Sequence, residues 1–270
     1  MKRYQASRLI ANAARVSQTM HPPDMRIGSL ADDPGLQQQM ETLTDRAWPP
    51  FLYHAPLPGK YWNTIHATFP EFQRLFFDGD RLIACANMVP LRYDGAFEDL
   101  PPGGLEWGQT AAVEGAGSGL VPNVAMGFQI VIAPQYRGGG ISPLAVVEMK
   151  RVAAAAGLTH VILPVRPVWK ERHPEIPMQD YIGWHRADGL PVDPWLRVHI
   201  RLGARMVGPC PASTIVPGRL ADWREWTGLT FPVTGRYPIP GGLDLLNVDL
   251  EADHGVYTEP NVWMVHEARS

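Results

Sequence analysis

The stretch Val131-Ile132-Ala133-Pro134-Gln135-Tyr136-Arg137-Gly138-Gly139-Gly140-Ile141-Ser142-Pro143 decides the fold of this chain. Strand-forming residues enter a glycine turn, and a helix is expected to begin directly after it. Consecutive glycines adopt backbone conformations that side chains forbid, and the first turn of a helix offers unpaired N–H groups and the positive end of its dipole. The turn therefore predicts a binding site for an anionic group, above all a phosphate.

Two common phosphate-binding loops do not fit this turn. No Lys-Ser or Lys-Thr pair follows the glycines, as a P-loop requires, and the GxGxxG fingerprint with an acidic residue about twenty positions further on is absent. The spacing Gln135-x-x-Gly138-x-Gly140 instead resembles the acyl-CoA pyrophosphate loop of the GNAT acyltransferase superfamily. The resemblance implies an N-acyltransferase that moves an acyl group, most simply acetyl from acetyl-CoA, to a primary amine by direct attack in a ternary complex.

The resemblance also implies which residues bind CoA. They are Ile130, Val131, Ile132, Gln135, Tyr136, Arg137, Gly138, Gly139, Gly140, Ile141 and Ser142. In the family, a backbone N–H of the central strand, here about Val131, stabilises the oxyanion, and the open backbone of that strand pairs with pantetheine. The following helix supplies the N–H groups that face the pyrophosphate.

The predicted order of elements supports the same family. Periodicity and turn signals predict, in chain order, a strand over 25–30, a helix over 34–46, a short helix over 61–68, a hairpin of 72–77 and 82–91, a loop over 94–119, a strand over 125–133, a helix over 142–157 and a strand over 160–165. Alternation along the central strand places Met126, Phe128, Ile130 and Ile132 on one face. The expected fold class is α/β (α+β), a GNAT-like mixed, mostly antiparallel sheet flanked by helices.

Three parts of the chain are expected. Residues 1–24 form an N-terminal arm or helix, and residues 25–208 form the acyl-CoA-binding core with an insertion at about 166–192. Residues 209–270 form a long C-terminal extension packed on the core.

His199 is the predicted catalytic residue. The family often ends the helix after the second parallel strand with Tyr-x-x-x-Gly-Phe, where the tyrosine protonates the leaving thiolate, and this chain has His199-Ile200-Arg201-Leu202-Gly203-Ala204. A histidine, whose unperturbed pKa is about 6.5, supplies either an acid or a base at neutral pH. A packed, structural histidine is the alternative.

The identity of the general base is open. No acidic residue or histidine lies between Asn123 and Pro134, where some family members carry a glutamate. Glu106 and Glu114 on the preceding loop either reach the acceptor amine or are solvated loop charges. Glu259 and Asn261, next to Pro260, are further candidates for contact with the amine.

Composition excludes several partners. A net charge of −3 over 270 residues gives no basic field for nucleic acid or for an anionic membrane. Cys85 and Cys210 lack metal-ligand spacing, and His173 and His185 lie in an irregular stretch, so no metal is expected. Without a secretory apolar block or a run of about 20 apolar residues, a soluble, cytoplasmic protein is expected.

Two other functions remain open at this point. A non-catalytic acyl-CoA-binding or sensor module would keep the glycine turn without turnover. An enzyme that takes longer acyl groups or a carrier-protein donor would use the apolar insertion to wall its pocket. The acceptor is a small-molecule or peptide amine, and a homodimer is compatible with the exposed strands predicted in the C-terminal extension.

Overall fold

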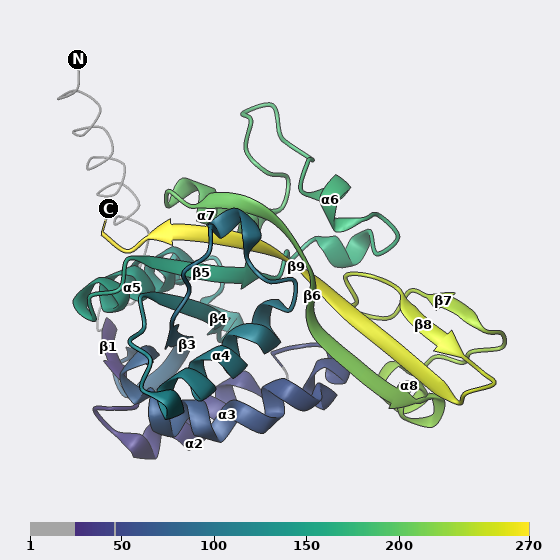
Figure 1. Cartoon of the computed structure of the whole chain (residues 1–270), viewed down its shortest axis with the longest axis horizontal. Helices are drawn as coiled ribbons and strands as arrows, with labels where there is room; N and C mark the ends of the chain where they lie inside the picture. Colours follow the sequence, from purple (N-terminus) through teal and green to yellow (C-terminus); the bar gives the residue numbers. More distant parts are fainter. Residues whose placement is uncertain (1–24, 46, 270) are drawn as a thin grey trace.

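The computed structural model describes residues 25–45 and 47–269, so the arm expected over 1–24 lies outside the described residues. Nine strands of the described part form one sheet in the order β1-β2-β3-β4-β5-β9-β8-β7, and β6 pairs with β9 (Figure 1). The strands are β1 (Met25–Ser29), β2 (Gln73–Asp78), β3 (Arg81–Leu91), β4 (Val124–Ile132), β5 (His160–Val165), β6 (Arg205–Arg219), β7 (Gly235–Tyr237), β8 (Leu246–Asp249) and β9 (His254–Glu267). Only β4 and β5 pair in parallel among these strands, so the expected mixed, mostly antiparallel sheet is confirmed.

Helices cover both faces of the sheet. They are α2 (Gln37–Thr44), α3 (Pro56–Thr68), α4 (Gly104–Ser118), α5 (Ile141–Ala155), α6 (Met178–Tyr181), α7 (Pro194–Arg201) and α8 (Leu220–Thr227). We call the face under α2, α3 and α4 the front face, and the face under α5 and α7 the back face. Val131 shares a buried cluster with Met40 of α2 on the front, and Gly127 lies against Met149 of α5 on the back.

The loop expected over 94–119 is wrong, because α4 occupies most of it. Its glycines serve close packing rather than turns. A Cβ at Gly108 would come within 2.0 Å of Met126 Sδ on β4, so only a glycine lets the helix lie this close to the strand. Glycine content alone therefore misled the prediction of secondary structure.

The alternation expected along β4 holds as far as Phe128, which contacts Trp62 of α3 on the front face, and is wrong beyond it. Asn87 of β3 lies opposite Gln129, and the next residue of β3, Met88, lies opposite Gly127, so Phe128 is the extra residue of a β-bulge. Gln129 and Val131 therefore share the front face with Met126, while Ile130 and Ile132 face the back. A bulge arises from strand pairing, which the sequence of one strand does not report.

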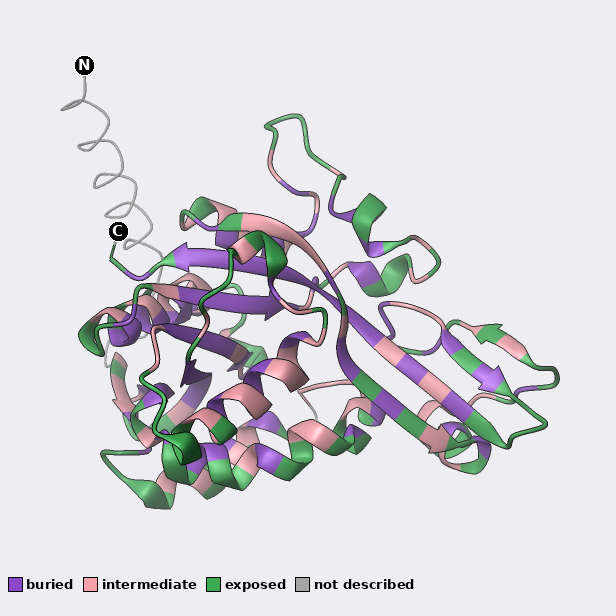
Figure 2. Cartoon of the chain, viewed as in Figure 1, coloured by how far each residue is buried: buried purple, intermediate pink, exposed green. Residues whose placement is uncertain are grey.

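The C-terminal extension completes the main sheet. β9 lies between β5 and β8, and β6 pairs along its length, so the expected boundary at 208/209 falls inside β6. The distal halves of β6 and β9, with β7, β8 and α8, form a C-terminal lobe beside the main body (Figure 1). Its own core contains Phe51, Trp223 and Tyr257. Along β8 and the distal part of β9, buried residues alternate with more exposed ones (Figure 2). The division into core and extension stays a prediction.

None of the helices in 25–45 and 47–269 combines the length and the apolar character that crossing a bilayer needs.

Candidate active site

The glycine turn has the conformation that its sequence predicts. Gly138 and Gly140 have φ of 82° and 81°, in the left-handed region that favours glycine. Gly140 is the N-cap of α5, and no side chain caps this helix. The N–H groups at the start of α5 therefore face the turn without a side-chain partner, which is an arrangement that fits a phosphate group.

The other residues predicted to bind CoA surround this turn. Tyr136 is held by its hydroxyl, which donates to Asp78 Oδ2 at 2.9 Å and so ties the turn to the β2–β3 hairpin. Gln135 and Arg137 are exposed, and Arg137 Nε donates to the carbonyl oxygen of Ile132 at 3.2 Å. Ile130 and Ile132 are half-buried on the back face.

The strands β4 and β5 separate beside the turn. They pair only from Val124–Met126 to His160–Ile162, whereas β4 stays paired with β3 as far as Ile132, and β5 stays paired with β9 as far as Val165. From Gly127 onward the edge of β4 that faces β5 has no strand partner. Its free backbone N–H and C=O groups fit an extended ligand that carries amides, such as pantetheine.

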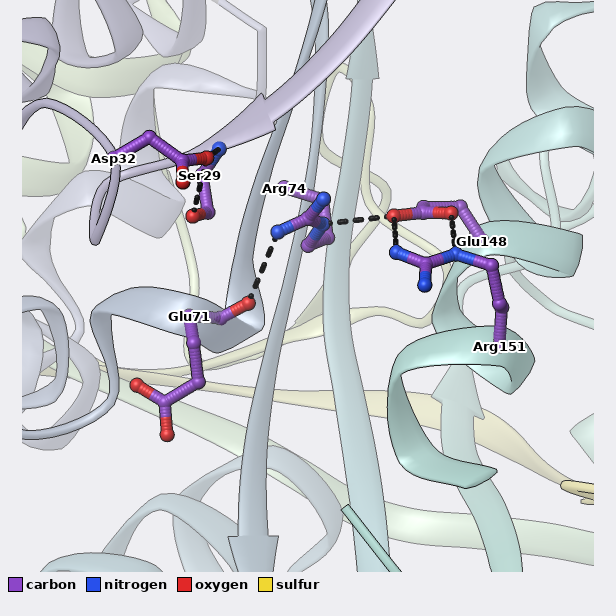
Figure 3. A network of polar contacts seen from close by, with 6 residues as sticks. All are labelled: Ser29, Asp32, Glu71, Arg74, Glu148 and Arg151. Atoms are coloured by element: carbon purple, nitrogen blue, oxygen red, sulfur yellow. Dashed lines mark hydrogen bonds and ion pairs between the residues drawn. The ribbon is translucent and has the colours of Figure 1, made fainter. Parts of the chain in front are cut away.

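An ion-pair network fixes α5 against the sheet (Figure 3). Glu148 of α5 is buried; its Oε1 accepts from Arg74 Nε of β2 at 2.9 Å, and its Oε2 accepts from Arg151 Nε at 2.7 Å. Arg74 Nη1 also donates to the carbonyl oxygen of Glu71 at 3.3 Å. This network attaches α5, the helix that carries the anion-binding N–H groups, to strand β2.

His199 is buried on the back face. Its side chain is 0% exposed, and its Nδ1 lies 2.9 Å from Nε2 of His266. Burial holds the pKa of His199 well below its usual range and lowers the pKa of His266 to about 4, so both rings are neutral at pH 7. His266 lies opposite Val161, within the closed half of the β4–β5 pair, and the other ring in contact with His199 is that of Trp195. His199 is thus attached to β9, and its catalytic role stays a prediction.

Sequence reasoning missed a chain of buried side-chain amides beneath the bulge of β4. Trp48 Nε1 donates to Gln129 Oε1 at 3.1 Å, Gln129 Nε2 to Asn87 Oδ1 at 3.0 Å, and Asn87 Nδ2 to Gln73 Oε1 at 2.9 Å. Gln73 Nε2 donates to the carbonyl oxygens of Phe69 and Met88 at 2.9 Å. Because indole only donates and carbonyls only accept, every amide in the chain has one allowed orientation.

The candidate acidic residues fall in different environments. Glu259 is buried and binds Arg166 Nε and the hydroxyl of Tyr257. Glu106 and Glu114 lie on α4 rather than on a loop; Glu114 is exposed, and Glu106 is half-buried. Asn261 Nδ2 donates to the carbonyl oxygen of Pro164 and to Ser213 Oγ.

Within residues 25–45 and 47–269, no group of three or more His, Cys, Asp or Glu side chains is arranged to hold a metal ion. Cys85 and Cys210 are both buried free thiols on different strands. His173 contacts the rings of Tyr181 and Trp184.

Comparison with known proteins extends over nearly the whole chain. The arginine N-acetyltransferase avaD of Aspergillus versicolor is 27% identical over 276 aligned residues, which cover 91% of this chain and 94% of that protein. The loading GNATL domain of CurA from Lyngbya majuscula superposes with a TM-score of 0.57 at 15% identity, over 91% of this chain and 97% of the domain. The fold of this chain is therefore that of the GNAT superfamily.

Other comparisons agree with the GNAT fold. The GphF GNAT-like decarboxylase, solved in complex with isobutyryl-CoA, superposes with a TM-score of 0.50 at 17% identity. The superposition covers 90% of this chain and 100% of the decarboxylase chain. No protein-family model matches the sequence.

Proposed function

We propose that this protein is an acyl-CoA-dependent N-acyltransferase, most simply an acetyltransferase, that acts on a small-molecule amine. The observation that carries the proposal is the uncapped N-terminus of α5 behind a glycine turn, next to the unpaired edge of β4. An anion site and a free strand edge at this spacing fit the pyrophosphate and the amide-bearing arm of CoA. The relative that is an arginine N-acetyltransferase supports an amine acceptor.

Each part of this site has a role in acyl transfer. The N–H groups of Ile141 and Ser142 hold the pyrophosphate, and the free edge of β4 aligns the pantetheine arm. The neutral amine attacks the thioester carbonyl carbon; a C–N bond forms and the C–S bond breaks. The amine loses one proton to water or a base, and the thiolate takes up one proton. A backbone N–H near Val131 stabilises the oxyanion between these steps.

The sequence predicts His199 as the source of that proton, but its place in the fold favours a structural role. Its ring is fully buried against His266, so proton delivery requires the contact between α7 and β9 to open. A role in holding α7 against β9 needs no such motion. The variant described in the Discussion separates these roles.

A thiol-release assay with acetyl-CoA against a panel of amines tests the activity, beside a thermal-shift titration with CoA. Gly139→Glu adds a carboxylate to the turn, and Gly139, unlike its neighbours, does not have a positive φ, so the backbone tolerates the side chain. Gly117→Glu on an exposed position of α4 is the matched control. We expect the CoA-dependent shift to vanish only in Gly139→Glu.

The outcomes separate the alternatives. Amine-dependent thiol release supports the N-acyltransferase. A thermal shift with CoA but no turnover with any amine or acyl-CoA favours the sensor module. Turnover with long acyl-CoA or an acylated carrier protein, but not with acetyl-CoA, favours an enzyme that takes longer acyl groups or a carrier-protein donor. Absence of a shift in the wild-type protein overturns the CoA site.

A further inference from the structure

The first turns of α4 lie where β4 and β5 separate. Met126 and Ile162 form the last residue pair between these strands, and Gly108 of α4 packs directly on Met126. Met126 faces the front, so α4 covers the point of separation from the front face. A group held by this part of α4 is close to the start of the free edge of β4.

Asn261 connects this helix to the open half of β5. Its Nδ2 donates to the carbonyl oxygen of Pro164 at 3.2 Å and to Ser213 Oγ at 2.8 Å. Ser213 Oγ also accepts from the backbone N–H of Leu105 in the first turn of α4 at 3.1 Å. The Asn261 amide therefore lies one shared hydroxyl away from the start of α4.

Two buried side-chain oxygens in this region lack a hydrogen-bond donor, and a carboxylate on α4 has one donor but no cation. Asn261 is 6% exposed and Gln109 is 1% exposed, and neither Asn261 Oδ1 nor Gln109 Oε1 has a hydrogen-bond partner within the described chain. Glu106 Oε1 accepts from the backbone N–H of Ile215 at 2.8 Å. No cationic side chain among residues 25–45 and 47–269 forms an ion pair with Glu106.

These oxygens are on the same side of the helix or next to its start. Glu106 and Gln109 are three residues apart on α4, which places their side chains next to each other. Burial raises the pKa of Glu106, as expected for a carboxylate that is removed from water without a cation. Glu259, the neighbouring acid on β9, is already compensated by Arg166 and Tyr257.

An unpaired buried oxygen destabilises the folded protein, and a buried carboxylate without a cation destabilises it more. A ligand group that brings a positive charge and several N–H donors would supply donors to the two amide oxygens and a counter-charge to the carboxylate of Glu106. We propose that Glu106, Gln109 and Asn261 bind a cationic, N–H-rich group of the acceptor, a guanidinium or a second ammonium. The identification of this ligand as the acceptor rests on the proposed acyltransferase function.

The bound cation is not the amine that reacts. A carboxylate partner favours the protonated form of an ammonium, and a protonated amine has no lone pair for attack on the thioester. The site also repels the phosphates of CoA, which fit the turn at the start of α5 instead. The acceptor therefore carries at least two nitrogen functions, one neutral and reactive and the other charged and bound by α4.

A matched set of ligands tests this proposal. L-arginine amide, L-lysine amide and L-norleucine amide share the reactive α-amine and differ in a guanidinium, an ammonium or an apolar end. Calorimetric titration into the protein with bound CoA measures binding without turnover. Glu106→Gln and Gln109→Met are compared with the wild-type protein and with Glu114→Gln, which changes an exposed acid on the same helix.

We expect Glu106→Gln to weaken binding of the arginine or lysine amide by about tenfold or more, from the loss of a charge-assisted contact. Binding of the norleucine amide and binding of CoA should not change. Gln109→Met should also weaken binding of the cationic amide, yet keep or raise the melting temperature, because it removes an unpaired buried oxygen. The ranking of the arginine and lysine amides identifies guanidinium or ammonium as the preferred group.

Equal weakening for the norleucine amide, or the same effect from Glu114→Gln, would overturn the proposal, as would unchanged binding of both cationic amides. Failure of the acyltransferase function looks different. In that case the Glu106-dependent binding persists while no amine releases thiol from acetyl-CoA.

Discussion

Arg74 and Arg151 bind the same buried carboxylate, that of Glu148, but from different environments (Figure 3). The side chain of Arg74 is 11% exposed, whereas that of Arg151 is 60% exposed. Arg74→Met should therefore lower the free energy of unfolding by about 3 kcal/mol, because it leaves a buried carboxylate poorly compensated. Arg151→Met should cost less than about 1 kcal/mol. Urea unfolding of both variants measures the difference, and equal losses would contradict the assigned role of burial.

The ion pair between Arg74 and Glu148 also holds α5 in place, so loss of this pair should lower the affinity for CoA. We expect Arg74→Met to weaken CoA binding, since the N-terminus of α5 loses its attachment to β2, while Arg151→Met keeps wild-type affinity. Calorimetric titration with CoA at a temperature where both variants are folded makes the comparison.

The buried pair of Arg166 and Glu259 joins the end of β5 to β9, and Tyr257 donates to the other carboxylate oxygen. Arg166→Met or Glu259→Leu alone should each cost about 3–5 kcal/mol, because one charge is left buried without its partner. The double variant should be more stable than either single variant. A double-mutant cycle by chemical unfolding measures this coupling; additive losses would show that the two charges act independently.

The asparagine in the buried amide chain should be a sensitive position. Asn87→Leu keeps the side-chain size but leaves Gln73 Oε1 without a partner and Gln129 Nε2 with only its weak contact to Cys85 Sγ, at a cost of about 2–4 kcal/mol. Trp48→Phe removes one donor at the more exposed end and should cost about 1 kcal/mol. Unfolding curves of the two variants compare these losses of stability. A larger loss in Trp48→Phe than in Asn87→Leu would contradict the orientation assigned to the buried side-chain amides.

Stability should fall in acid because of buried histidines. Burial lowers the pKa of His66 to about 4 and that of His266 to about 4, below the value of about 6.5 in an unfolded chain. Between these values the unfolded chain takes up protons that the folded chain does not. The free energy of unfolding should therefore decrease as pH falls from about 6.5 toward 4, by up to about 1.4 kcal/mol per pH unit for each histidine.

The variant His66→Leu should make this pH dependence shallower by the contribution of one proton. His185→Gln, at an exposed position, is the control and should keep the wild-type slope. Urea unfolding at several values of pH between about 4.5 and about 7.5 provides the slopes. An unchanged slope in His66→Leu would show that this ring does not contribute.

For His199, burial and the contact with His266 lead us to expect a loss of stability rather than of chemistry. His199→Phe should lower the melting temperature and retain most of kcat below that temperature. A fall in kcat of about 10²-fold or more with an unchanged melting temperature would instead support proton transfer by His199. Measurement of kcat and of the melting temperature on the same preparation distinguishes these roles.

Local signals in the sequence determined the central part of the fold. The glycine turn at 138–140, the Asp-Gly hairpin at 78–80 and the apolar run at 160–165 act within a few residues, so their structure follows from backbone preferences and side-chain periodicity. The resemblance of the turn to that of the GNAT superfamily followed from the same residues. Because these features need no distant partner, the sequence alone was sufficient to predict them.

Tertiary structure alone decided the front face of the candidate site. The glycines of α4 had to meet Met126, the bulge at Phe128 had to arise from pairing with β3, and β9 had to insert between β5 and β8. Only this packing joins Asn261 to the start of α4 through Ser213, and only burial leaves the side-chain oxygens of Gln109 and Asn261 without donors. Such contacts join residues far apart in the chain, and neither composition nor periodicity reports which distant residues meet or how deeply they are buried.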